Sequence, residues 1–289
     1  VSIMTQSFSY GTGCFEGIRA YWNADEEQLF LFRLREHYER LHRSARLLHC
    51  RVAQSPQELC DITVDLLRRE GFREDVYVRP IAYKATEGIG VRLHNLRDSL
   101  CIFALTFGKH TEREEGLAAG VSPWRRVDDN AIPPRAKIVG AYVNSALSTT
   151  EAAMAGFDEA IVLDQDGHVS EGSAANIFLV REGMLVTPSA DCNILEGITR
   201  ATLIEIAREE LGLQTQVRTV DRSELYVADE VFLCGTGVQI AAVTSVDHRP
   251  VGDGRLGAVT QRLRELYFAI VRGRNPRYRH WCTPVYGSD

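Results

Sequence analysis

The sequence of 289 residues lacks several features that would place it in a specialised class of protein. No apolar run approaches the roughly 20 residues that a membrane-spanning helix needs, so we expect no membrane contact. Lys and Arg (33) are fewer than Asp and Glu (39), and the net charge of −6 argues against a nucleic-acid partner. The chain begins Val1-Ser2-Ile3 without an initiator Met, which leaves open whether residues precede Val1.

The seven cysteines lack the spacing of a disulfide framework or a zinc ribbon, since no pair has the C-x-x-C pattern. In an apolar run, as at Cys101, a cysteine behaves as a small hydrophobe. This usage favours a reducing cytoplasm. His37, His42 and His49 are five and seven residues apart, which is not the i,i+4 spacing of helical zinc pairs, so we expect no metal.

Two glycine-rich segments lack the complete dinucleotide-binding pattern. In Gly11-Thr12-Gly13-Cys14-Phe15-Glu16-Gly17 the third glycine is one residue out of place, and Gly235-Thr236-Gly237 has no third glycine. We therefore exclude a Rossmann site. The second segment still offers backbone donors to a ligand, because glycine permits close approach.

What is present is an alternation of strand-like and helix-like segments. Apolar runs predict strands at 29–33, 75–83 and 99–107, and helical spacing of apolar residues predicts a helix over 34–48. Ser55-Pro56-Gln57-Glu58 predicts a capped helix start, and Gly71 its end. In the second half the patterns predict strands at 116–124, 159–163, 176–180, 215–219 and 230–234, helices at 142–156, 198–211 and 257–272, and a helical turn at 222–227.

Length and the interleaving of helices with strands favour two domains of the α+β or α/β class. The polar segment 108–115 interrupts the apolar pattern. We therefore expect a small α/β domain at 1–107, an interdomain loop at 108–115 and a large domain at 116–289.

Lys137 follows the proline-stiffened segment 132–136 and precedes the apolar residues Ile138 and Val139. A lone lysine in such a place is usually a solvated surface residue. Apolar neighbours would lower the pKa of the amine and keep it neutral, the form that attacks an aldehyde and moves a proton. Tyr142, five residues on, could bring a phenol to the ring oxygen of an aldehyde cofactor.

Two later segments offer groups that complement this amine. Glu171, followed by Gly172 and other small residues, leaves room for a flat ring and could keep a pyridine nitrogen protonated, although alone it resembles a surface turn residue. Gly197-Ile198-Thr199 opens a helix whose free N–H groups could bind phosphate, although such a start is more often only a capped helix. Together these groups are what pyridoxal phosphate chemistry requires.

Eight motifs in a fixed order extend over nearly the whole chain. They are Tyr10-Gly11-Thr12 with Phe15-Glu16-Gly17-Ile18-Arg19, His37 with Arg40-Leu41, Tyr77-Val78-Arg79-Pro80, Lys137 with Tyr142, Ser170-Glu171-Gly172 with Asn176, Gly197-Ile198-Thr199-Arg200, Ala228-Asp229-Glu230-Val231-Phe232 and Gly235-Thr236. With them the chain resembles the class IV (fold type IV) pyridoxal phosphate-dependent aminotransferases, most closely the branched-chain amino acid aminotransferases. It departs from the family pattern at Ala141, Ala174-Ala175, Glu196 and Gly237-Val238.

The resemblance implies a pyridoxal 5'-phosphate cofactor in an active site between the two domains, at the interface of a homodimer or larger homo-oligomer. Lys137 would be the Schiff-base lysine and proton shuttle, Glu171 the partner of the pyridine nitrogen, and Tyr142 that of the ring oxygen. The implied cofactor-binding residues are Arg40, Lys137, Tyr142, Glu171, Gly172, Asn176, Ile198, Thr199 and Thr236. Of these, Arg40, Ile198, Thr199 and Thr236 would hold the phosphate.

The resemblance also implies the substrates, which are small amino acids and 2-oxo acids. The implied substrate-binding residues are Tyr10, Phe15, Gly17, Arg19, Tyr77, Arg79, Thr236 and Gly237. The Thr236-Gly237 backbone would receive the α-carboxylate, and Arg79 could hold the second carboxylate of glutamate. The implied reaction is amino transfer between branched-chain L-amino acids (leucine, isoleucine, valine) and 2-oxoglutarate by a ping-pong mechanism.

Several alternatives stay open at this stage. An (R)-selective amine transaminase, a D-amino acid transaminase or a 4-amino-4-deoxychorismate lyase would share the fold and the catalytic lysine. The segment Tyr77-Val78-Arg79-Pro80 favours the branched-chain assignment over these enzymes. A small-molecule binding protein that uses only the pocket is the non-enzymatic alternative.

Overall fold

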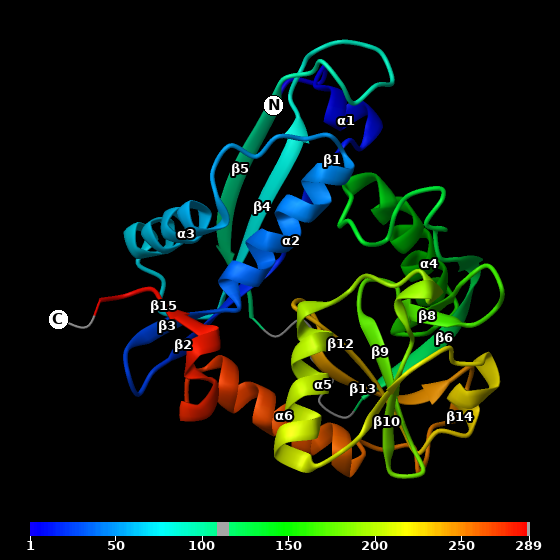
Figure 1. Cartoon of the computed structure of the whole chain (residues 1–289). Helices are drawn as coiled ribbons and strands as arrows, with labels where there is room; N and C mark the ends of the chain where they lie inside the picture. The colour runs from blue at the N-terminus through cyan, green and yellow to red at the C-terminus, as the bar shows by residue number, and fades with distance from the viewer. Residues whose placement is uncertain (109–115, 288–289) are drawn as a thin grey trace. The chain divides into compact units, whose positions relative to one another are not determined.

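The computed structural model describes residues 1–108 and 116–287, which form two compact units (Figure 1). Unit 1 contains Val1–Gly108, Ala136–Ala141 and residues 268–287, and unit 2 contains residues 116–135 and Tyr142–Tyr267. Each unit mixes helices with a sheet, as the sequence predicts. The predicted interdomain loop at 108–115 lies, except for Gly108, outside the described residues.

Unit 1 is built on an antiparallel sheet. Its strands are β1 (Gly13–Phe15), β2 (Ile18–Asn23), β3 (Gln28–Phe32), β4 (Val76–Lys84), β5 (Asp98–Thr106) and β15 (Cys282–Pro284). They run in the order β1-β4-β2-β3-β15, and β5 pairs with the other edge of β4. Buried and half-buried residues alternate along β4, because successive side chains of a strand point to opposite faces.

Helices α2 and α3 lie on one face of this sheet (Figure 1). The helical segments of unit 1 are α1 (Gln6–Tyr10), α2 (Leu34–Leu47), α3 (Pro56–Glu70) and the 3-10 turns η1 (Val139–Ala141) and η4 (Pro276–Trp281). The capping box predicted for α3 is formed: the Glu58 backbone N–H donates to Ser55 Oγ over 3.3 Å, and the Ser55 N–H donates to the Glu58 carboxylate over 2.7 Å. Gly71 closes the helix at φ +69°, as predicted.

The chain's division differs from the predicted boundary in two segments. Residues 268–287 join unit 1, because β15 pairs with β3 and the Arg272 guanidinium binds both carboxylate oxygens of Asp75 over 3.0 and 2.9 Å. Residues 136–141 also join unit 1 through backbone contacts with β1. Local sequence patterns carry no information about these distant partners, so the sequence placed both segments in the second domain.

Unit 2 is built on a mixed sheet. Its strands are β6 (Leu117–Arg125), β7 (Glu159–Leu163), β8 (Val169–Gly172), β9 (Asn176–Arg181), β10 (Met184–Thr187), β11 (Thr215–Val217), β12 (Glu230–Gly235), β13 (Gln239–Val246) and β14 (Arg249–Pro250). The order is β11-β10-β9-β12-β13-β6-β7-β8, with β14 beside β13. The pairs β13·β6, β6·β7 and β10·β11 are parallel and the other pairs are antiparallel.

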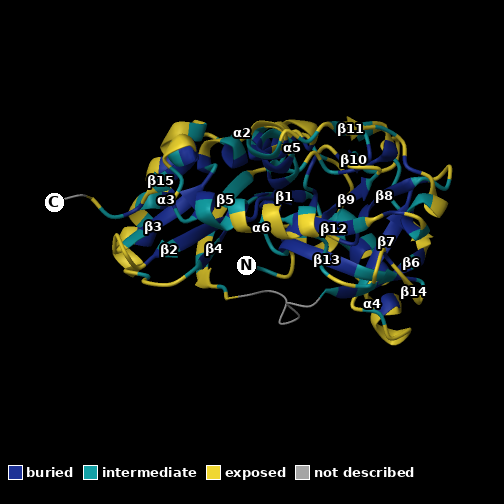
Figure 2. Cartoon of the chain, turned by 90° about the horizontal axis from the view of Figure 1, so that it is seen from below, coloured by how far each residue is buried: buried dark blue, intermediate teal, exposed yellow. Residues whose placement is uncertain are grey.

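The helical segments of unit 2 are α4 (Tyr142–Met154), α5 (Ile198–Leu211), the 3-10 turns η2 (Ala190–Cys192) and η3 (Arg222–Tyr226), and α6 (Ala258–Val271) as far as Tyr267. The last four residues of α6 belong to unit 1. Helix α4 contacts β6 and β7, and α5 contacts β11 and β12. Figure 2 shows β9, β12 and β13 as mostly buried strands, and their apolar side chains form the centre of unit 2. Phe178 and Phe232 stack at 5.1 Å between ring centres, across paired positions of β9 and β12.

Candidate functional site

The segment that carries Lys137 is fixed to β1 and α2 of unit 1. The Phe15 N–H donates to the Lys137 carbonyl over 3.0 Å, and the Lys137 N–H donates to the buried Ser44 hydroxyl over 3.2 Å. Gly140 donates to the Gly11 carbonyl, and a Cβ on Gly11 would lie 2.7 Å from the Gly140 Cα. Glycine is therefore needed where the two segments meet, and the lysine is held in a defined place.

The Lys137 side chain lies beside an aromatic and cationic cluster. Its Nζ is 5.1 Å from the centre of the Phe15 ring, and the Arg79 guanidinium lies 4.7 Å from the same centre. Arg79 donates to the Tyr77 hydroxyl over 2.8 Å. A Cβ on Gly17 would be 2.4 Å from that hydroxyl, so glycine gives Tyr77 its space. Four residues predicted to line the substrate pocket thus lie together, with the lysine beside them.

The half-buried Arg79 has no ion pair with a carboxylate among the described residues. Its guanidinium contacts the Tyr77 hydroxyl and the faces of the Phe15 and Tyr77 rings, and its Nε has no hydrogen-bond partner in the described residues. An arginine held in place by neutral groups keeps donors free for an anionic ligand.

Arg40 is buried, although the charged sequence around it is typical of a solvated helix face. Its Nε and Nη2 donate to the two carboxylate oxygens of Glu16 over 2.7 and 2.8 Å, and His37 Nδ1 contacts the same carboxylate at 2.8 Å. Burial alone would raise the pKa of Glu16, but the charge and hydrogen bonds of Arg40 and then of His37 outweigh it and lower the pKa to about 2. Glu16 is therefore a carboxylate at neutral pH.

Two further predicted residues of unit 1 are engaged with backbone groups. The Arg19 guanidinium is buried and donates to the carbonyls of Phe107 and Gly108 over 2.8 and 2.6 Å. The Tyr10 hydroxyl, at the end of α1, accepts from the Gly90 N–H over 3.2 Å. Contact of either residue with substrate stays a prediction.

In unit 2, Glu171 ends up in a network of donors at the end of β8. Asn176 Nδ2 and the Leu195 N–H each donate to Oε2 over 3.1 Å, and Arg126 Nη2 lies 2.9 Å from Oε1. The carboxylate is almost fully buried, at 3% exposure of the residue. Glu171 is therefore not a surface turn residue.

The start of α5 meets this network. A Cβ on Gly197 would lie 2.0 Å from Asn176 Oδ1, so only glycine lets the asparagine keep its position. No side chain caps the helix at Gly197, which leaves the first N–H groups beside Ile198 and the buried Thr199 available to a ligand.

The turn between β12 and β13 lies at the same end of the sheet. Thr236 and Gly237 are half-buried in this turn, and Cys234 of β12 pairs with Asn176 of β9. Glu171, Asn176, the start of α5 and the Thr236 turn are thus neighbours at one end of the sheet. Of the other residues predicted to bind the cofactor, Gly172 closes β8 and Tyr142 begins α4.

Sequence reasoning missed Glu16 and His37 as partners of Arg40, and Arg126 as a partner of Glu171. An acidic residue between Phe15 and Gly17 was the available signal for the first group. No local signal distinguishes Arg126 from its neighbour Arg125, which is exposed.

Other candidate chemistry is absent from the described residues. They contain no group of three or more His, Cys, Asp or Glu side chains that could hold a metal ion. Burial raises the pKa of the Cys14 and Cys234 thiols, so neither is a reactive thiolate. None of the helices in residues 1–108 and 116–287 is long and apolar enough to cross a bilayer.

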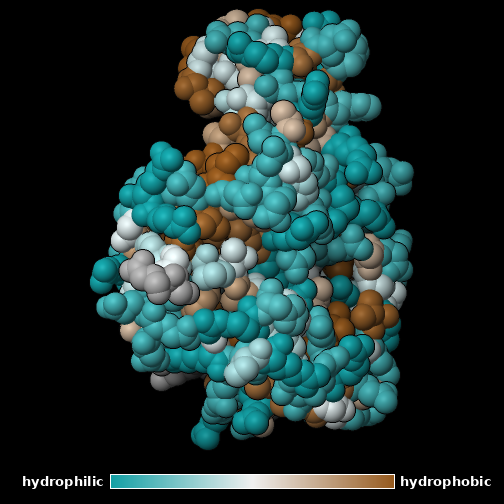
Figure 3. Space-filling view, turned by 60° about the vertical axis from the view of Figure 1, so that its left-hand side comes forward, coloured by the Kyte–Doolittle hydropathy of each residue, from teal (hydrophilic) through white to brown (hydrophobic). Residues whose placement is uncertain are grey.

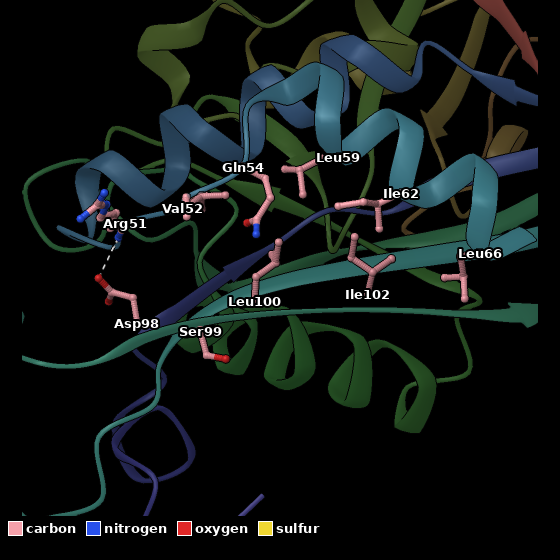
Figure 4. Close-up of a pocket in the computed structure, with 11 residues that line it drawn as sticks. Arg51, Val52, Gln54, Leu59, Ile62, Leu66, Asp98, Ser99, Leu100 and Ile102 are labelled. Atoms are coloured by element: carbon pink, nitrogen blue, oxygen red, sulfur yellow. Dashed lines mark hydrogen bonds between the residues drawn. The ribbon is translucent and has the colours of Figure 1, made fainter.

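A cavity of about 470 Å³ lies between α3 and β5, away from the predicted site residues (Figure 4). Leu59, Ile62 and Leu66 of α3 face Leu100 and Ile102 of β5 across it. At its rim, the Arg51 N–H donates to the Asp98 carboxylate over 2.9 Å. The Asp98 carboxylate is also paired with Lys84 Nζ at 2.8 Å, and none of the predicted site residues lines this cavity.

Known proteins resemble the chain over nearly its whole length. The sequence model of the family "Amino-transferase class IV" matches residues 13–246. A probable branched-chain-amino-acid aminotransferase of Aquifex aeolicus is 49% identical over 286 residues, which cover 99% of this chain and 92% of that protein.

Two solved structures share the fold. The branched-chain aminotransferase of Thermoproteus uzoniensis with norvaline superposes with a TM-score of 0.94 at 44% identity, covering 99% of this chain and 94% of that one. The branched-chain amino acid aminotransferase of Thermobaculum terrenum in its PLP form gives 0.95 at 39% identity, with the same coverage. With this agreement in sequence and structure, the chain belongs to the class IV aminotransferase family.

Proposed function

We propose that this enzyme transfers amino groups between branched-chain L-amino acids and 2-oxoglutarate, using pyridoxal 5'-phosphate. One observation carries the choice of substrates: the Lys137 amine and the Arg79 guanidinium lie at the same Phe15 ring, at 5.1 and 4.7 Å from its centre. A substrate beside this ring meets an apolar face for an aliphatic side chain and a cation for a second carboxylate. Both are needed by an enzyme that alternates between leucine and glutamate.

The residues present fit pyridoxal phosphate. Glu171 is a buried carboxylate suited to a protonated pyridine nitrogen, and the uncapped start of α5 at Ile198 and Thr199 suits a phosphate. Arg40 and the Thr236 turn would supply further phosphate contacts, and Lys137 supplies the amine. When bound, the cofactor supplies an electron sink and carries the amino group between the two half-reactions.

This chain's own residues would bind, orient and move protons. Lys137 would move a proton to and from the substrate's α-carbon, as an amine held by its backbone bonds to Phe15 and Ser44. Glu171 would keep a proton at the ring nitrogen. Arg79 would hold the second carboxylate of glutamate, and the apolar ring of Phe15 would receive the side chain of leucine.

We also propose a homodimer or larger homo-oligomer in a reducing cytoplasm. The nine-residue strand β5 pairs with β4 alone among the described residues, and it exposes Phe103 (43%) and Leu105 (41%). Apolar side chains also gather on the surface seen in Figure 3. Such an edge favours association with a second copy, and sedimentation at micromolar concentration tests it. The seven cysteines are all free thiols, which supports the proposal of a reducing cytoplasm.

The test is a set of separate half-reactions with purified protein. We expect visible absorption from a bound cofactor, its loss on L-leucine and its return on 2-oxoglutarate. In Lys137→Ala both changes should disappear. In Arg79→Met the KM for 2-oxoglutarate should rise roughly 10- to 100-fold, because hydrogen bonds to a charged group contribute that much to binding. The KM for L-leucine should change little.

Other outcomes would contradict the proposal. A protein without visible cofactor absorption is not a pyridoxal phosphate enzyme. Conversion of (R)-1-phenylethylamine or D-alanine in place of L-leucine would indicate the amine or D-amino acid enzyme, and turnover of aminodeoxychorismate without any 2-oxo acid would indicate the lyase.

A further inference from the structure

Arg126 occupies a defined place immediately after β6. Its backbone N–H donates to the Leu163 carbonyl over 2.8 Å, and its own carbonyl accepts from the Gln165 side chain over 2.9 Å. Its side chain turns inward, where Nε donates to the Asn193 carbonyl over 3.3 Å and Nη2 reaches Glu171 Oε1 at 2.9 Å. The guanidinium is thus held at both ends.

The pair is nearly dry, with side-chain exposures of 12% for Arg126 and 4% for Glu171. The two carboxylate oxygens are engaged differently. Oε1 contacts the cation, whereas Oε2 accepts from the Asn176 amide and the Leu195 N–H, both neutral donors. A cation at 2.9 Å in a poorly solvated place stabilises the ionised carboxylate far more than either neutral donor does.

We propose that Arg126 is a positioning residue that holds Glu171 ionised and fixes the direction of its carboxylate toward the cofactor's ring nitrogen. This inference rests on the proposed function. When a carboxylate and a pyridine nitrogen share a proton, its place depends on their relative basicity. By binding Oε1, Arg126 lowers the basicity of Glu171, so the proton stays on the nitrogen. Without Arg126, proton occupancy of the nitrogen falls and the carboxylate rotates more freely.

The neighbouring residue offers a matched control. Arg125 has the same side chain and lies one position earlier, at the end of β6, but it is exposed. Its guanidinium has no hydrogen bond or ion pair among the described residues, and its backbone carbonyl accepts from the Asn144 amide over 2.9 Å. Arg125→Met therefore removes the same charge from the chain without touching Glu171.

The experiment compares wild type, Arg125→Met, Arg126→Met and Arg126→Lys, each loaded with pyridoxal phosphate that carries 15N in the ring. The 15N chemical shift reports protonation of the ring nitrogen, and equilibrium titration gives the cofactor's Kd. We expect Arg126→Met to move the 15N signal toward the deprotonated position and to raise Kd at least tenfold. Arg126→Lys should fall between it and wild type, and Arg125→Met should match wild type.

The outcomes separate this inference from the proposed function. If wild type binds no cofactor, the proposed function fails. If wild type shows a protonated nitrogen and Arg126→Met keeps the same 15N shift and Kd, only the role of Arg126 is overturned. Should Arg126→Met fail to fold, Arg126→Lys decides: a Kd equal to that of wild type would overturn the inference, and a Kd raised several-fold would support it.

Discussion

Neutralising Glu16 by Glu16→Gln should destabilise unit 1 strongly, because it removes the carboxylate that faces buried Arg40. The side chain of Glu16 is fully buried, and its two oxygens lie 2.7 and 2.8 Å from the Arg40 nitrogens. Removing one partner of a buried pair leaves the other charge uncompensated, which costs on the order of 3–5 kcal/mol.

The pKa of Glu16 gives a similar magnitude and a direction in pH. Burial opposes ionisation, but Arg40 and His37 together lower the pKa from 4.5 to about 2. At about 1.4 kcal/mol per pH unit, this lowering corresponds to about 3 kcal/mol of folding free energy. Because the folded-state pKa is the lower one, the contribution is fully present above about pH 4.5 and is lost as the pH falls toward 2. Burial also lowers the pKa of His37. Protonation of His37 on acidification therefore also destabilises the folded state.

Urea unfolding followed by tryptophan fluorescence measures the effect. Trp22 and Trp281 lie in unit 1 and Trp124 in unit 2, so a Trp124→Phe background confines the signal to unit 1. The difference between wild type and Glu16→Gln should be largest near pH 7 and shrink as the pH approaches 2.

The matched control is Glu26→Gln, which breaks the exposed pair with Arg279 in the same unit. Exposed pairs contribute about 0–1 kcal/mol, so this variant should stay close to wild type. If Glu16→Gln costs no more than Glu26→Gln, or if its cost does not change with pH, the assignment of Glu16 as a buried carboxylate that compensates Arg40 is wrong.

Two smaller perturbations test other parts of the fold. In Gly197→Ala the new Cβ should displace the Asn176 side chain from its hydrogen bonds to Glu171 and to the Leu195 carbonyl. We expect urea titrations to show a free energy of unfolding lower by about 1–3 kcal/mol. Equal stability of mutant and wild type would contradict the close contact between residues 197 and 176. Ser55→Ala removes the N-cap of α3 and should lower the free energy of unfolding by about 1 kcal/mol in thermal unfolding. Gln57→Ala, at an exposed site of the same first turn, should leave the stability unchanged. Equal effects of the two substitutions would argue against the cap.

The secondary structure could largely be predicted from the sequence, because its signals are local. The strand at 29–33 and the helix from Ser55 to Gly71 follow from apolar spacing and capping residues, and both are confirmed. The strands β1, β2, β8, β10, β13, β14 and β15 escaped prediction. Strands of two to four residues show too little periodicity. The longer β2 and β13 are buried along most of their length, so their side chains show no alternation of buried and exposed positions.

The order of the motifs around Lys137, Glu171 and Thr199 indicated the family from the sequence alone, because an amine, a carboxylate and a phosphate-binding helix start in this order are the groups that pyridoxal phosphate requires. Only the tertiary structure decided that the Lys137 segment belongs with β1, that Arg40 is buried against Glu16, and that Arg126 binds Glu171. Each of these pairings joins residues 24 to 122 positions apart in the sequence. Nothing in a local pattern fixes which buried charge meets which partner; the packing of the complete chain does.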